Sequence, residues 1–346
     1  MNRFSHHLKE VASGIFVHTQ TIGFQRKNFS VNIYLLAGEG GLVFDAGYGG
    51  KKHGRGLGRA IRAVSGLKNS SQKPNQITRA LPSHGHWDHF SGLKYLQDHL
   101  GIEICATRKQ AETICSKQIY KQTFRGTRNP FHIQPKSRFK QVCHQIKDQL
   151  SKELFMALLN VRFVSGPVTI LNEDSVLTVD RQPWQILPLP GHADDDIVLY
   201  NRDRGIVLGG DILLNSVTTW LGPPRSNLAD YTAGLEHLKT LPRLRLILPG
   251  HGRPIRDPIP RIQSAIDHRN QRTQDLFRVI ADAGNQGIGF ETVFQHFYPA
   301  PKAVPRYILE GWICLTLDHL IETGKIRISK KEREVRFHAN DSALPF

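Results

Sequence analysis

The sequence of 346 residues is poor in cysteine, has no apolar run of membrane-spanning length and carries fewer acidic than basic side chains. Its four cysteines (Cys105, Cys115, Cys143 and Cys314) show no CxxC or paired spacing, which argues against a disulfide scaffold and a cysteine zinc site. The first residues, MNRFSHHLKEV, lack the apolar stretch of a signal peptide. We therefore expect a cytoplasmic protein with reduced thiols and no membrane partner.

Several common catalytic signatures are also missing. The chain has no Walker-type phosphate loop, no internal repeat and no nucleophile elbow that would present a catalytic serine or cysteine. The apolar content is nevertheless 39%, and the length suffices for one large domain and a smaller one. We expect a soluble globular protein whose chemistry depends on other residue types.

Positive charge is in excess and is unevenly distributed. Lysine and arginine number 46 against 30 aspartates and glutamates, a net charge of +16. Residues 105–150 hold ten basic and two acidic side chains. Such a segment would raise the local concentration of anions and speed their capture, although it could equally be an ordinary solvated surface.

The run HGHWDH at residues 84–89 concentrates three histidines and an aspartate. His84 and His86 are two positions apart, so in an extended loop their imidazoles project to the same side. Asp88 and His89 follow at once and can reach a second point nearby. Imidazole and carboxylate are the usual ligands of catalytic zinc, and this cluster suits a pair of metal ions better than a single one.

Three later segments each place one such side chain after a short apolar run. His192 follows QILPLPG, Asp211 follows GIVLGG and His251 follows LRLILPG. Each run is branched and is bounded by Pro or Gly, which predicts a buried strand followed by a turn. A rigid sheet can hold ligands at such strand ends while the loops admit a substrate.

In these motifs the sequence resembles the metallo-β-lactamase superfamily. Asp45 in VFDAG, the HGHWDH run, His192, Asp211 and His251 occur in the order of that family's five motifs. The resemblance runs from about residue 10 to 257 and implies an α/β fold, a four-layer αββα sandwich with the metals at one edge. We expect a catalytic domain at 1–257 and a small winged-helix-like α+β domain at 258–346.

The resemblance also implies two divalent metal ions, zinc, with iron or manganese as alternatives. It assigns His84, His86 and His192 to the first metal, Asp88, His89 and His251 to the second, and Asp211 to both. Asp88 would in addition act catalytically by orienting the nucleophile and shuttling its proton. Asp45 would not bind metal but would steady the metal-binding loop.

The 102 residues between His89 and His192 exceed what a compact member of the family needs. We expect a helical insertion at about 116–162, near the active-site edge, acting as a lid, a substrate wall, a dimer contact or simple packing. Apolar residues recur there every three or four positions and predict the buried face of one amphipathic helix. They are Phe139, Cys143, Ile146, Leu150, Leu154 and Leu158.

The C-terminal part follows a stiff connector with three prolines. Its pattern predicts helix, helix, helix and hairpin, which looks like a winged helix. It also resembles the C-terminal domain of certain β-lactamase-like hydrolases, in the pair His268-Arg269 and the run from His319 to Lys325. In those hydrolases the module mostly packs on the catalytic domain, and DNA binding is the alternative.

Two adjacent metals would let a metal-bound hydroxide attack a carbonyl or a phosphorus. The first hypothesis is an ester, thioester or lactone hydrolase, similar to glyoxalase II or a thioesterase, with a small or carrier-bound anionic substrate. The alternatives are a metal-dependent ribonuclease or phosphodiesterase, with RNA as partner, and a single-iron persulfide dioxygenase. A homo-oligomer is possible in each case. Phe24, Phe29, Trp87 and Trp220 are candidate substrate-selecting residues.

Overall fold

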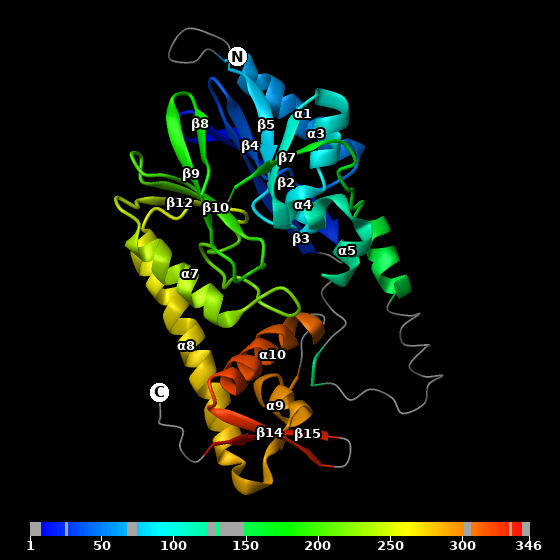
Figure 1. Cartoon of the computed structure of the whole chain (residues 1–346), viewed down its shortest axis with the longest axis vertical. Coiled ribbons are helices and arrows are strands. Elements are labelled where there is room, and N and C mark those ends of the chain that lie inside the picture. The colour runs from blue at the N-terminus through cyan, green and yellow to red at the C-terminus, as the bar shows by residue number, and fades with distance from the viewer. Residues whose placement is uncertain are drawn as a thin grey trace.

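Two β-sheets stacked face to face, with helices on both outer faces, form the larger part of the molecule in Figure 1. The computed structural model describes residues 8–24, 27–67, 75–123, 129–131, 149–172, 174–300, 306–331 and 334–340. The layered arrangement is the αββα sandwich that the sequence predicted, and that prediction is confirmed.

The first sheet has seven strands whose spatial order is their order in the chain. They are β1 (Leu8–Ala12), β2 (Ile15–Phe24), β3 (Lys27–Leu36), β4 (Gly41–Phe44), β5 (Ile77–Leu81), β6 (Glu103–Thr107) and β7 (Val168–Leu171). β1 to β4 are antiparallel neighbours, whereas β4 to β7 run parallel. The parallel half needs crossover connections, and all three of them contain helices.

The second sheet has five strands in the order β12-β11-β10-β9-β8. They are β8 (Val176–Val179), β9 (Gln182–Pro188), β10 (Ile197–Asn201), β11 (Ile206–Gly210) and β12 (Leu246–Pro249). β10, β11 and β12 are buried at every position, as expected for strands covered on both faces. The apolar runs before His192, Asp211 and His251 therefore form β9, β11 and β12.

Apolar side chains fill the space between the two sheets. Tyr34, Phe44 and Leu81 of the first sheet meet Trp184 and Leu208 of the second, all at most 1% exposed. Close packing of this kind fixes how the strand ends of one sheet stand relative to the other. It therefore fixes the edge where the strand-end loops of both sheets meet.

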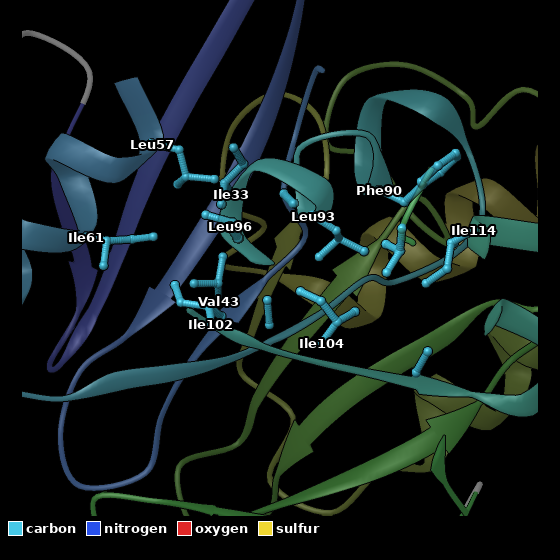
Figure 2. Packing of buried hydrophobic residues seen from close by; sticks show 14 of the residues in the cluster. Ile33, Val43, Leu57, Ile61, Phe90, Leu93, Leu96, Ile102, Ile104 and Ile114 are labelled. Atoms are coloured by element: carbon cyan, nitrogen blue, oxygen red, sulfur yellow. The ribbon is translucent and has the colours of Figure 1, made fainter. Parts of the chain in front are cut away.

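Helices α1 (Lys51–Ser65), α3 (Leu93–Leu100) and α4 (Arg108–Cys115) cover the first sheet. On α1 the buried residues Leu57, Ile61 and Val64 are spaced at helical intervals and form one face. Figure 2 shows Leu57 and Ile61 beside Ile33 and Val43 of the sheet. Helices α7 (Leu228–Thr240) and α8 (Pro258–Asp282) pack against the second sheet.

α8 extends beyond the sandwich into a second, smaller core. Its first half packs on the second sheet through Ile262 and Ile266, while Leu276 and Ile280 belong to the C-terminal core. That core also contains α9 (Phe290–Phe297), α10 (Arg306–Glu322) and a three-stranded sheet. The sheet consists of β13 (Ile288–Gly289), β15 (Glu334–Ala339) and β14 (Ile326–Lys331). The predicted helices and hairpin are present; the winged-helix assignment and the boundary at 257/258 stay predictions.

The expected insertion is helical where the structure describes it, but its predicted buried face is wrong. α5 (Lys117–Gln122) and a helix at 149–158 are present, and Glu153 pairs with Lys117 and Lys121. Three of the leucines expected inside lie outside, with Leu150 64%, Leu154 60% and Leu158 62% exposed. The helix instead buries its neighbouring face through Met156 and Phe155. Phe139, Cys143 and Ile146 lie outside the described residues.

Phe131 connects the insertion to the C-terminal core. Its ring lies 5.0 Å from the ring of Phe337 and 6.3 Å from that of Phe290. At the other end Phe155 packs edge-on against Trp87 of the HGHWDH run, with 5.9 Å between ring centroids. The insertion thus contacts both the predicted metal loop and the C-terminal part. In the described part of the chain no helix is long and apolar enough to cross a membrane.

Candidate metal centre

The predicted site residues come together at one edge of the sandwich, each just beyond the end of a strand. Asp45 follows β4, and the HGHWDH run follows β5. His192, Asp211 and His251 follow β9, β11 and β12. Residues more than 200 positions apart in the sequence thereby form one cluster of polar side chains.

His84, His86 and His192 form the first group, with one ligand atom from each within 4.8 Å of the others. His84 Nε2 lies 2.7 Å and His192 Nε2 2.9 Å from His86 Nδ1. The opposite nitrogens point outward: His84 Nδ1 is 2.9 Å from Ser83 Oγ. Three imidazoles that turn one nitrogen each toward a common centre can hold a metal ion.

Asp88, His89 and His251 form the second group, again within 4.8 Å. His251 Nε2 is 3.4 Å from Asp88 Oδ2, and its Nδ1 faces the backbone oxygen of Ser30. Two ligand sets beside each other are what a dinuclear centre requires.

Asp211 stands between the two groups. Its Oδ2 lies 3.6 Å from His192 Nε2 of the first group, and 3.5 Å from His89 Nε2 and 3.3 Å from His251 Nε2 of the second. A carboxylate at these distances can serve a metal ion on either side.

Two buried atoms at this centre have no hydrogen-bond partner among the described residues. They are His89 Nε2 and Asp211 Oδ1. Leaving a buried polar atom unpaired costs about 1–3 kcal/mol, so such atoms are rare unless something else satisfies them. A metal ion between these side chains would satisfy them, and the residues present therefore fit the predicted metals.

Asp45 is in contact with the loop rather than with the centre of the site. Its Oδ2 lies 2.9 Å from His89 Nδ1, and its Oδ1 accepts a hydrogen bond of 2.7 Å from the backbone N–H of Ser83. Asp45 is fully buried and has a positive φ of 66°, an uncommon backbone conformation for a residue other than glycine. These contacts orient His89 so that its Nε2 faces the second group.

The charges of the cluster are strongly coupled. Burial alone would raise the pKa of Asp211, but His251 and His89 outweigh it and hold that pKa well below its ordinary value. Burial would lower the pKa of His89, whereas the carboxylates of Asp45, Asp211 and Asp88 raise it well above the ordinary value. Without a cation the cluster therefore favours ionised carboxylates beside protonated imidazoles; the carboxylates are in the form that binds a cation, and a metal ion would bind in place of the imidazole protons.

Two residues that form hydrogen bonds with the backbone of the HGHWDH loop were not predicted from the sequence. Gln110 donates from its side-chain amide to the backbone oxygens of Pro82, Ser83 and Asp195 at 3.0–3.2 Å. Asp195 accepts from the backbone N–H of Gly85 at 3.1 Å and from Arg225 at 2.8 Å. The run of acidic residues just after His192 could have indicated this role from the sequence, whereas no sequence pattern indicated Gln110.

Tyr48 was missed as well. Its ring stacks on that of Trp87 with 5.1 Å between centroids, and its buried hydroxyl has no hydrogen-bond partner among the described residues. Burial, together with the charges of Asp88 and Asp211, raises the pKa of this phenol. The hydroxyl is therefore a protonated donor close to the metal ligands. Trp87, a candidate for substrate selection, packs here, and Trp220 contacts the C-terminal part.

Comparison with known families agrees with this geometry. The family model described as "Metallo-beta-lactamase superfamily" matches residues 26–251. The chain belongs to the metallo-β-lactamase superfamily. It is accordingly a metal-binding hydrolase of that superfamily, as the sequence motifs predicted.

Two relatives indicate the range of activities nearby. The probable metallo-hydrolase YqjP of Bacillus subtilis is 25% identical over 264 residues, covering 72% of this chain and 76% of the relative. The acyl-coenzyme A thioesterase MBLAC2 of Gallus gallus is 27% identical over 258 residues, covering 72% and 80%.

Solved structures share the fold over nearly the whole chain. A metallo-β-lactamase family protein from Thermus thermophilus aligns with a TM-score of 0.69 at 20% identity, covering 96% of this chain and all of that one. A β-lactamase domain protein from Burkholderia ambifaria aligns with a TM-score of 0.73 at 18% identity, covering 96% and 93%. At these identities the likeness concerns the fold alone.

Proposed function

We propose that this superfamily member is a dinuclear metal-dependent hydrolase of acyl thioesters. The observation that carries the proposal is the pair of ligand groups with Asp211 between them. The thioester is suggested by the similarity to acyl-coenzyme A thioesterases. Among the hydrolases considered from the sequence, this choice agrees best with both.

In this proposal the first metal is held by His84, His86 and His192 and the second by Asp88, His89 and His251, with Asp211 shared. When bound, two divalent ions lower the pKa of water toward neutrality and polarise an acyl carbonyl. No serine or cysteine nucleophile is then required. Cys105 and Cys314 agree with this, because burial raises the pKa of both thiols.

The protein's own side chains supply orientation and proton handling. The side chain of Asp88 is 18% exposed, against none for His89, so it can meet both the pocket and a substrate. Its carboxylate can orient water and accept a proton from it. Tyr48 offers a neutral hydroxyl that can donate to an oxygen of the substrate or of water.

The charge of the chain favours an anionic thioester. Acyl-coenzyme A carries several phosphates, and a net charge of +16 raises the rate at which such a substrate is captured. The same charge would suit RNA, which is why a phosphodiester substrate belongs in the test.

The test is metal analysis of the purified chain together with hydrolysis of four probes: an acyl-coenzyme A, a lactone, a model phosphodiester and a single-stranded RNA. We expect about two divalent ions per chain and thiol release from the acyl-coenzyme A. The double variant His84→Ala/His86→Ala should abolish this release and remain folded, because the sandwich core lies between the sheets. The exposed His237→Ala is the matched control and should retain activity.

Cleavage of RNA without thioester hydrolysis would replace the proposal with a nuclease. One tightly bound iron per chain, with Asp88 and His251 dispensable, would replace it with the single-iron dioxygenase alternative.

A further inference from the structure

We propose that the C-terminal part of the chain positions the metal ligand His192 through the indole of Trp220. This inference rests on the proposed function, since it takes His192 as a metal ligand. α8 and α10 lie outside the metal-binding motifs, and the proposal gives these two helices a role in supporting the metal centre.

The first step is the tautomer of His192. Its Nδ1 lies 2.8 Å from the backbone oxygen of Trp220. A carbonyl oxygen can only accept a hydrogen bond, so Nδ1 must carry the hydrogen and Nε2 must present a lone pair. Nε2 is the nitrogen that faces His86 and Asp211. The Trp220 carbonyl therefore fixes both the ring orientation and the metal-binding nitrogen.

The second step is what holds that carbonyl in place. The indole Nε1–H of Trp220 donates 3.1 Å to the backbone oxygen of Ile308 on α10. The neighbouring backbone oxygen, of Thr219, accepts a hydrogen bond from Arg269 of α8, a side chain that is 7% exposed. The peptide that contacts His192 is thus attached on both sides to the helices of the C-terminal part.

The third step is the close packing of this loop on α10. A Cβ added to Gly222 would lie 3.2 Å from the Cα of Gly311, and one added to Gly311 would lie 2.6 Å from the oxygen of Leu221. The loop and α10 therefore touch backbone to backbone. A displacement of α10 cannot be absorbed by side chains and must be passed to the loop.

Three of the other histidine ligands are supported differently. His89 contacts Asp45 after β4, His84 contacts Ser83 after β5, and His251 contacts Ser30 within β3. These supports come from the sandwich itself. Damage to the Trp220 link should therefore weaken one metal position and spare the other.

The decisive variant is Trp220→Phe, which keeps an aromatic ring at this position but removes the Nε1–H, together with the outer indole carbons that lie against Gly222 and Gly311. The matched control is Trp312→Phe on α10, whose Nε1–H donates 2.9 Å to Tyr298 within the C-terminal core. Both variants lose one indole hydrogen bond, but that of Trp312 has no connection to His192.

Zinc affinity is measured by competition with a chelator. Wild type should bind two zinc ions, and Trp220→Phe should bind one of them more weakly, by at most the about 10–100-fold that loss of a ligand's hydrogen-bond partner costs, because the carbonyl remains but is held less firmly. Trp312→Phe should bind both ions as wild type does, whatever it loses in stability.

Nitrogen chemical shifts of the His192 ring in the metal-free protein give a second readout, independent of activity and of bound metal. We expect the hydrogen on Nδ1 in wild type and in Trp312→Phe, and a mixture of tautomers in Trp220→Phe. Unchanged zinc affinity and an unchanged tautomer in Trp220→Phe would overturn the inference while leaving the hydrolase proposal intact. If wild type bound neither zinc nor iron nor manganese, the hydrolase proposal would be overturned instead.

Discussion

Asp211 and Asp88 are neighbouring carboxylates with different surroundings, so their loss should have different effects. Asp211 approaches His192 of the first group as well as His89 and His251 of the second, whereas Asp88 has close contacts with the second group. Asp211→Ala should lower the metal affinity of both positions. Each loss should exceed about 10–100-fold, which is typical when only a hydrogen-bond partner of a ligand is removed. Asp88→Asn should spare the first position and reduce turnover by about 10²–10⁴.

Metal titration of the two variants, followed by steady-state kinetics with both ions saturating, separates these effects. Equal losses at both positions from both substitutions would show that the assignment of the two carboxylates is wrong.

Asp318 on α10 should make the protein less stable as pH rises. Burial, reinforced by the charge of Glu322, raises the pKa of Asp318 from 3.8 to about 6. The folded state therefore binds the proton more tightly than the unfolded state, and stability falls between about pH 4 and pH 6 as the proton is lost. Asp318→Asn should raise the free energy of unfolding at pH 7.5 by about 1–2 kcal/mol, less than the full equivalent of the shift because the site is partly exposed.

Urea unfolding at pH 5 and pH 7.5 measures this difference. The substitution Asp203→Asn at an exposed loop position serves as the control and should change little. A variant of Asp318 with the same pH dependence as wild type would contradict the prediction.

At the scale of elements, the strand-end ligands were predictable because strand and turn are local features of the sequence. The apolar runs become β9, β11 and β12, and the polar residue after each reaches the same edge. The insertion helix was predicted from equally regular spacing, yet its leucines at 150, 154 and 158 lie outside. Periodicity identifies a helix but does not decide which of two apolar faces the rest of the chain covers.

Two helical glycines provide a test of how closely α10 approaches the loop before α7. Alanine is favoured over glycine in helices by about 0.8–1 kcal/mol. At Gly56 on α1 an added Cβ meets nothing nearer than 3.8 Å, whereas at Gly311 it meets a backbone oxygen at 2.6 Å. Gly56→Ala should therefore stabilise the protein by up to that amount. Gly311→Ala should destabilise it by about 1–3 kcal/mol, as overpacking does.

Thermal unfolding of both variants gives the comparison. A stabilising Gly311→Ala would mean that α10 and the loop are not packed as tightly as the structure shows.

The excess positive charge of the chain should increase the rate of substrate capture. Changing Arg125, Arg128 and Lys136 to Glu should raise KM more than it lowers kcat, because long-range attraction contributes mainly to binding. The effect should shrink as salt rises, since exposed charges are screened beyond about 10 Å at 0.1 M. These three positions lie outside the described residues, so the expectation rests only on the charge of these residue types.

The matched control changes Lys9, Arg202 and Arg278, exposed on other elements, to Glu. Kinetics at low and high salt, with a sizing measurement beside them, distinguish the alternatives. If the segment serves packing or dimerisation instead, stability or oligomeric state will change while kinetics per folded chain stay constant.

The fold class could be predicted because the motifs resemble those of the metallo-β-lactamase superfamily, and most candidate ligands could be predicted from residue type and spacing. Each metal motif is a short run whose meaning depends on residue type and spacing, and the buried strands before them are local patterns of apolar residues. The HGHWDH run, His192, Asp211 and His251 could therefore be named from residue type and spacing, whereas Asp45 was named from the resemblance to the superfamily. Their roles as individual ligands stay predictions.

The residues that surround and support those ligands could not be predicted from the sequence. Gln110 donates to backbone oxygens, Tyr48 has a buried hydroxyl without a hydrogen-bond partner in the described part of the chain, and Trp220 connects His192 to α10. Backbone oxygens carry no sequence signal, and the contacts join segments from distant parts of the chain. Such contacts exist because two sheets and two cores pack in one particular arrangement, which no local pattern specifies.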